Sequence, residues 1–218
     1  MALTATERTT LKRLPERGSH ERATVRSILD EGIVCHVGFA TERGPVVIPT
    51  TYGRVGDDLY LHGSPASRML RTLKHGVPVC VTVTLVDALV LARSTFHHSI
   101  NYRSVVVFGT AVEVTDPDEK AAALAAFVEH IVPGRTADAR PATIKEVSGT
   151  LVLRLALAEA SAKVRVGPPI DDEEDLALPV WAGVLPFTAR PGPARPDAFV
   201  PDDVEVPAYV AAYDRPCS

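Results

Sequence analysis

The chain of 218 residues has little cysteine, no excess of positive charge and no long apolar run. Its three cysteines, Cys35, Cys80 and Cys217, form no Cys-x-x-Cys pair, which argues against a disulfide framework, a zinc knuckle or another metal site. We therefore predict reduced thiols and a cytoplasmic location. A net charge of −4 gives no basic surface for a nucleic-acid backbone.

Membrane segments and several common catalytic motifs are also missing. Apolar runs such as 105–108 are far shorter than the ~18 residues of a membrane span, and the N-terminus lacks the features of a signal peptide. The absence of Gly-x-Ser-x-Gly, Walker and Gly-x-Gly-x-x-Gly motifs leaves hydrolase, P-loop and Rossmann functions without support. We expect neither a membrane nor a nucleic-acid partner.

Short β-rich runs bounded by turn residues dominate the chain, and helices are inserted among them rather than alternating with them. This order predicts an antiparallel β-barrel with peripheral helices. Ten of the 18 prolines follow Gly167, so we expect an extended C-terminal segment. The predicted parts are an arm (1–19), a barrel domain (20–190) and a tail (191–218). The predicted helices are 21–30, 65–74 and 117–130, and the strands are 33–39, 45–52, 59–61, 78–85, 88–94, 103–114, 150–157, 162–166 and 180–185.

The segment 59–68 combines a strand end, a glycine turn and a helix start. Ser64 is the predicted cap and Pro65 the first helical residue, with Ser67 and Arg68 facing outward in the first turn. Unpaired amides at a helix start, two hydroxyls and a guanidinium suit a phosphate group. The alternative is an ordinary capped helix with a surface arginine.

Two further polar clusters and one tryptophan are candidate site elements. His97 and His98 precede a buried strand at the expected barrel rim, and adjacent strand residues face opposite ways, which disfavours shared chelation of a metal. Lys163 and Arg165 alternate, so they share one face of a strand. Trp181 is either a packing anchor or a flat wall for an aromatic cofactor.

At these residues the sequence resembles the pyridoxamine 5'-phosphate oxidase-related family of FMN-binding split barrels, and within it the flavin-nucleotide-binding branch that includes nitroimidazole-resistance reductases. The resemblance covers about residues 17–185. It rests on segments 47–52, 59–68, 101–106 and 181–183 in this order.

The resemblance implies a six-stranded split barrel that forms a homodimer with one FMN in each cleft between subunits. It places one strand along the flavin ring, the turn and helix start at the phosphate, and residues of a neighbouring strand, a basic residue and a tryptophan beside the cofactor. The implied cofactor-binding residues are Val47, Ile48, Pro49, Thr50, Thr51, His62, Gly63, Ser64, Ser67, Arg68, Asn101, Arg103, Ser104, Lys163 and Trp181.

The leading functional hypothesis is an FMN-dependent oxidoreductase acting on a small-molecule substrate. Lys163 or Arg165 is the candidate cation for the reduced flavin, and His62, His97 and His98 are candidate proton donors. Met69 follows Ser67-Arg68 where the oxidases carry a basic residue, and the C-terminal Arg-x-His segment is absent, which argues against true pyridoxamine phosphate oxidation.

Two alternatives stay open. One is a non-catalytic carrier of flavin or haem on the same barrel, with FAD and deazaflavin as other candidate cofactors. The other is a cofactor-free structural dimer, which the density of donors at residues 62–68 disfavours.

Overall fold

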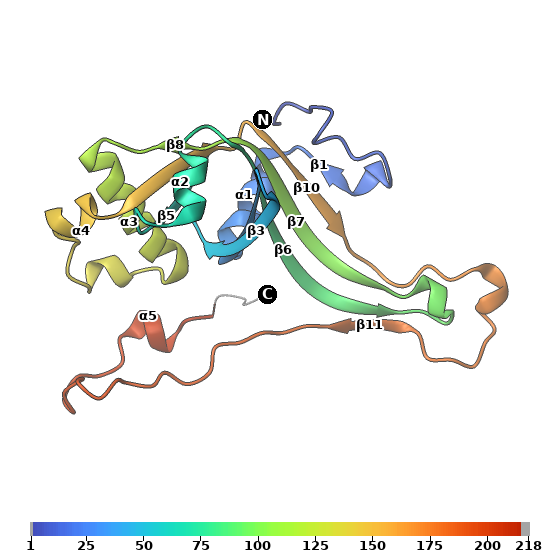
Figure 1. Ribbon diagram of the computed structural model, residues 1–218. Helices are drawn as coiled ribbons and strands as arrows, with labels where there is room; N and C mark the ends of the chain where they lie inside the picture. Colours follow the sequence, from blue (N-terminus) through green and yellow to red (C-terminus); the bar gives the residue numbers. More distant parts are fainter. Residues whose placement is uncertain (1, 215–218) are drawn as a thin grey trace.

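A computed structural model describes residues 2–214, so Cys217 lies outside the described residues. Figure 1 shows a body of strands and helices from which a long, bent hairpin extends. This arm is the outer part of β6 (Pro78–Leu91) and β7 (Ser99–Thr110), with β11 (Gly183–Pro186) paired to the outer half of β6. The C-terminal segment then runs back toward the body (Figure 1).

The larger sheet has the order β1-β10-β7-β6-β2-β3, with β11 attached to β6, and its neighbouring strands pair in antiparallel fashion. Among the described residues β1 and β3 do not pair with each other, so the barrel is open. Its other strands are β1 (Gly18–Ser19), β10 (Glu159–Arg165), β2 (Val34–Thr41) and β3 (Gly44–Thr51).

A smaller antiparallel sheet of order β4-β5-β9-β8 packs with the larger one around a common apolar core. The expected antiparallel split barrel with peripheral helices is thereby confirmed. The strands of this sheet are β4 (Gly53–Val55), β5 (Asp58–Gly63), β9 (Leu151–Ala156) and β8 (Val112–Glu113). The α-helices are α1 (Arg22–Glu31), α2 (Arg68–Leu73), α3 (Pro117–Ile131), α4 (Ile144–Ser148) and α5 (Ala208–Ala211), with short 3₁₀ turns at Pro15–Arg17, Thr95–His97, Arg135–Ala137 and Glu173–Asp175.

Helix α1 shows how local sequence fits the core. Its apolar stripe, Val25, Ile28 and Leu29, is buried, as helical spacing predicts. The helix ends at Gly32, where an added Cβ would lie only 2.5 Å from Cγ1 of Val83. This glycine therefore permits close packing of the helix end on β6.

Helix α2 begins later than the sequence predicts. Its N-cap is Ser67, whose hydroxyl accepts from the Leu70 amide, so the helix starts at Arg68 instead of Pro65. Ser64 instead accepts from the Ala66 amide in the preceding turn. The Asp116-Pro117 start of α3 is confirmed, because Asp116 accepts from the Glu119 amide at 2.7 Å.

Strand β6 is continuous where the sequence predicts two strands joined at Asp87. Val86 pairs with Tyr102 and Ala88 with Asn101, so Asp87 is an extra residue in a β-bulge. Buried positions fall on odd numbers up to Leu85 and on even numbers from Ala88. The bulge therefore keeps one face of the strand buried from the body into the arm.

The C-terminal segment is extended after β11 and then docks on the body through α5. Tyr209 bonds both Arg135 and Asp138, and the Tyr213 hydroxyl donates to the Ile131 carbonyl at 2.8 Å. Within residues 2–214 no helix is long and apolar enough to span a bilayer.

Candidate functional site

The turn between β5 and α2 carries the residues predicted to bind phosphate. The Ser67 amide donates to the Ser64 carbonyl at 2.8 Å, which turns the chain after Gly63 and sets Arg68 at the first helical position. Arg68 is exposed, and no side chain within residues 2–214 forms an ion pair with it. This guanidinium is therefore available to an anion.

Arg68 lines a cavity of about 700 Å³ between α2 and the β2–β3 hairpin. Arg43 contributes a second guanidinium and Glu42 the one carboxylate of the lining, while Val46 and Val77 are apolar. Two guanidiniums against one carboxylate favour a phosphate or another multivalent anion. The predicted anion site is thus a pocket shared by two elements rather than a helix end alone.

The predicted ring-binding strand, 47–51, is β3 at the edge of the larger sheet. Val46 and Ile48 pack against the core, whereas Val47 is 64% exposed and Pro49 is also exposed. An edge strand leaves backbone groups unpaired on its outer side. β3 therefore offers apolar side chains and free amide and carbonyl groups to a flat ligand.

His62 lies in a different pocket from Arg68, although the two residues are close in sequence. The His62 ring packs against the Phe127 ring of α3, with the ring centroids 4.0 Å apart and the ring planes tilted by 59°. Nδ1 of His62 is buried and has no hydrogen-bond partner among the described residues, and burial lowers the pKa of the imidazole. His62 is therefore neutral near pH 7.

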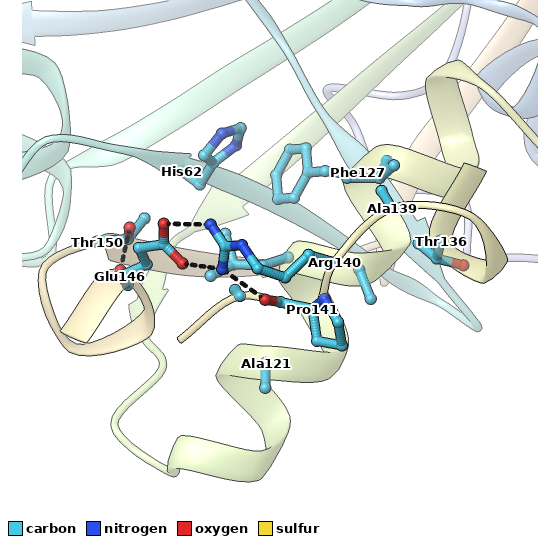
Figure 2. Close-up of a pocket in the computed structure, with 13 residues that line it drawn as sticks. His62, Ala121, Phe127, Thr136, Ala139, Arg140, Pro141, Glu146 and Thr150 are labelled. Atoms are coloured by element: carbon cyan, nitrogen blue, oxygen red, sulfur yellow. Dashed lines mark hydrogen bonds and ion pairs between the residues drawn. The ribbon is translucent and has the colours of Figure 1, made fainter. Parts of the chain in front are cut away.

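The His62 pocket has a volume of about 680 Å³ and opens between β5, α3 and the segment leading to α4. Figure 2 shows the His62 and Phe127 rings side by side above an ion pair of Arg140 and Glu146. The pKa of Glu146 falls to about 2, mainly because Arg140 bonds its carboxylate and also because Thr143 does. Most of the remaining lining is apolar: Ala121, Leu124, Ala125, Val128, Ala139, Pro141 and Ala142, together with Thr136 and Thr150.

Sequence reasoning did not identify this pocket. Phe127, Arg140 and Glu146 come from two helices and the loop between them, none of which carries a recognisable cofactor motif. One available signal was Thr143-x-x-Glu146, a capping box that predicts α4 and is present in the structure.

A second group of predicted residues lies on β7 and β10. Arg103 donates to both Glu31 of α1 and Asp87 of the bulge, which raises its pKa. Ser104 donates to the Lys163 carbonyl at 3.3 Å, and these two residues face each other in the strand register. Arg103 is thus already bound by two carboxylates within this chain.

Arg165 and Asn101 form a buried polar pair on the same two strands. Arg165 donates to the Asn101 side chain and to the carbonyls of Gly167 and Pro168. These acceptors are neutral, and burial lowers the pKa of the guanidinium. The pair fixes the point where β10 leaves the sheet.

His97, His98 and Trp181 lie on the arm. His97 contacts Asp172 at 3.1 Å, and Nδ1 of His98 lies 3.0 Å from the Ser94 carbonyl. Trp181 is 68% exposed beside Gly183 at the start of β11. Among residues 2–214 no group of three or more His, Cys, Asp or Glu side chains is placed to hold a metal ion.

The predicted cofactor residues therefore fall into separate groups within one chain. β2 and β6 lie between β3 and β7, so three strand spacings, about 14 Å, separate β3 from the Asn101–Ser104 group. The chain brings Arg68 together with the β2–β3 hairpin, and Asn101 together with Arg165. It does not unite these two groups at one point.

We next compared the chain with known protein families and structures. Residues 21–164 match the model of a family described as pyridoxamine 5'-phosphate oxidase. No curated protein gives a significant match.

Several solved structures are similar to this chain. The flavocytochrome Anf3 from Azotobacter vinelandii is 42% identical, with a TM-score of 0.88 over 94% of this chain and 95% of that one. A FAD and haem binding protein from Mycobacterium smegmatis is 37% identical, with a TM-score of 0.87 over 92% and 98% of the two chains. A structure described as a 5-nitroimidazole antibiotic resistance protein from Bacteroides thetaiotaomicron is 25% identical, with a TM-score of 0.57 over 67% and 86%.

Proposed function

Since this chain belongs to the pyridoxamine 5'-phosphate oxidase family, we propose that it is a flavin-dependent oxidoreductase that also binds haem and works as a homodimer. The observation that supports flavin binding is the cavity that Arg68 of α2 and Arg43 of the β2–β3 hairpin line together. The haem half rests on the two similar proteins named as a flavocytochrome and as a FAD and haem binder.

The residues present fit a flavin nucleotide. Arg68 and Arg43 supply charge for phosphate oxygens, and the exposed apolar side chains of β3 supply a wall for the ring. The similar M. smegmatis protein favours FAD over the FMN implied by the sequence resemblance. A bound flavin exchanges two electrons with an organic partner and single electrons with a metal centre.

The chain's own residues have narrower tasks in this proposal. The two arginines bind and orient the nucleotide, and Lys163 on β10 is the candidate cation beside the ring. His97 and His98 remain candidate proton donors, since an imidazole can both give and take up a proton. Their place on the arm puts them far along β6 and β7 from the body (Figure 1).

In the proposed homodimer, a second copy of this chain packs against the arm. Phe96 at its tip is 87% exposed, and Ile100, Val166, Trp181 and Leu185 are also exposed. A monomeric protein rarely leaves such a row of large apolar side chains in water. A partner laid along the arm would also bring a second β3 to the Asn101–Ser104 group that one chain holds apart.

The flavin proposal is tested by identifying the nucleotide released from purified protein and by titrating FAD and FMN into the apoprotein. Arg68→Ala should weaken binding by about 1.5–3 kcal/mol, or roughly 10- to 150-fold. Arg71→Ala, one turn along the same helix and outside the cavity lining, is the matched control. Equal affinity in the Arg68→Ala variant and the wild type would contradict the assigned site.

Oxidoreductase activity and assembly need separate measurements. Flavin that binds but is not reduced by NADH, NADPH or a reduced deazaflavin would favour a carrier instead. Sedimentation should give a dimer, and Phe96→Glu with Trp181→Glu should shift it toward monomer. Ile144→Glu, at an exposed apolar position on α4, should leave the dimer intact. A monomeric wild type would contradict the homodimer.

A further inference from the structure

We propose that His62 is the axial ligand of the haem iron, in the pocket between β5, α3 and the segment before α4; this inference rests on the haem binding proposed above. Haem iron in proteins is commonly held by a single imidazole. His62 supplies an imidazole that has no evident role in the hydrogen bonding around it. Nδ1 is buried without a partner among the described residues, although buried polar atoms are nearly always hydrogen-bonded.

The walls of the pocket suit a flat apolar ring. Five lining residues, 121, 124, 125, 127 and 128, come from α3, and they are alanine, leucine, phenylalanine or valine. The cavity of about 680 Å³ lies in the size range of cofactor pockets. The Phe127 ring contacts the His62 ring and fixes its orientation. Small side chains on α3 leave room for a macrocycle that larger ones would fill.

The rim of the pocket supplies the charge that haem propionates need. Arg140 is the one lysine or arginine in the lining, and it is held there by Glu146. A propionate could accept from Arg140 beside Glu146 or in its place, because both side chains are exposed. Thr136 and Thr150 also line the pocket, where their hydroxyls donate to Glu129 and to the Glu146 carbonyl.

Other histidines are less suited to the iron. His97 and His98 contact Asp172 and the Ser94 carbonyl on the exposed arm. His130 lies 2.8 Å from the Gly32 carbonyl. No charged group of the lining lies on β5 or α3; Arg140 and Glu146 face His62 from the segment around α4.

The test is a titration of hemin into the flavin-loaded protein, followed by the Soret band and by electron paramagnetic resonance. The wild type should bind one hemin per chain with the spectrum of an imidazole-ligated iron. His62→Ala should lose that spectrum and bind hemin at least tenfold more weakly, and added imidazole should restore the band. His62→Met should fold with the larger side chain in place and give a different, thioether-type spectrum.

Controls separate this inference from the proposed function. His75→Ala, at an exposed position after α2, should behave as the wild type, and flavin content should be unchanged in every variant. A wild-type spectrum in His62→Ala, or its loss in His98→Ala, would overturn the assignment of His62 while haem binding stands. A wild type that holds flavin but no hemin would overturn both haem statements and leave the flavin proposal standing.

Discussion

Replacement of Arg103 tests whether a residue that the family resemblance assigns to the cofactor instead holds the fold together. Its guanidinium donates to Asp87 at 2.7 and 3.0 Å and to Glu31 at 2.7 Å, joining the bulge of β6 to α1. Arg103→Ala removes the cation that both carboxylates contact. Breaking a fully buried pair costs about 3–5 kcal/mol. Since the Arg103 side chain is 28% exposed, solvent screening reduces the expected loss to about 2–3 kcal/mol.

That loss should lower the melting temperature by roughly 4–12 °C, because a chain of this length loses about 2–4 °C per kcal/mol. Thermal unfolding by circular dichroism measures it, in parallel with flavin affinity. Arg103→Lys should recover part of the loss, since one ammonium cannot reproduce the forked contacts. Arg71→Ala, on an exposed helix face, should change little. An Arg103→Ala protein as stable as the wild type, but with flavin binding lost, would refute this reasoning.

Three further predictions concern other parts of the chain. The bond from Arg8 lowers the pKa of Glu159 below its usual value near 4.5. The N-terminal segment should therefore stay docked above pH 4.5 and detach as the pH falls through the lowered pKa, where hydrogen exchange of residues 2–10 should rise. Glu159→Gln should show the faster exchange already at pH 7. Burial raises the pKa of Cys35 to about 12, so iodoacetamide at pH 8 should leave it unmodified in the folded protein, as peptide mapping would reveal. Tyr209→Phe removes two 2.7 Å bonds, to Arg135 and Asp138, and should make residues 187–207 several-fold more sensitive to protease; unchanged cleavage would show that these bonds do not hold the tail.

Local sequence signals predicted those elements whose ends depend on neighbouring residues. Asp116 and Pro117 mark the start of α3 because the cap and the fixed φ angle act within one turn. The β2–β3 hairpin follows for the same reason, with Gly44 at φ 110° in its turn. The open antiparallel barrel could be predicted because strand spacing leaves few other topologies.

The features that depend on distant contacts could not be predicted in this way. Nothing near Asp87 in sequence shows that β6 continues through it, because the bulge is fixed by its pairing with β7 and by Arg103. The position of His62 beside the phosphate turn suggested one shared site, yet its ring packs on Phe127, 65 residues later in the chain. That pocket exists only after α3 folds onto β5.

The extra residue in β6, Asp87, also determines which side chains of the outer strand face the core. Side chains alternate with a period of two, so if Asp87 paired as an ordinary strand residue, Ala88 and Val90 would turn outward and their neighbours inward. Deletion of Asp87 would instead leave both faces of the outer hairpin as they are, because Ala88 would then follow Val86 in regular alternation, opposite Asn101 and Tyr102. Any molecule that recognises the outer surface of the arm therefore depends on one residue of β6 staying out of the pairing with β7.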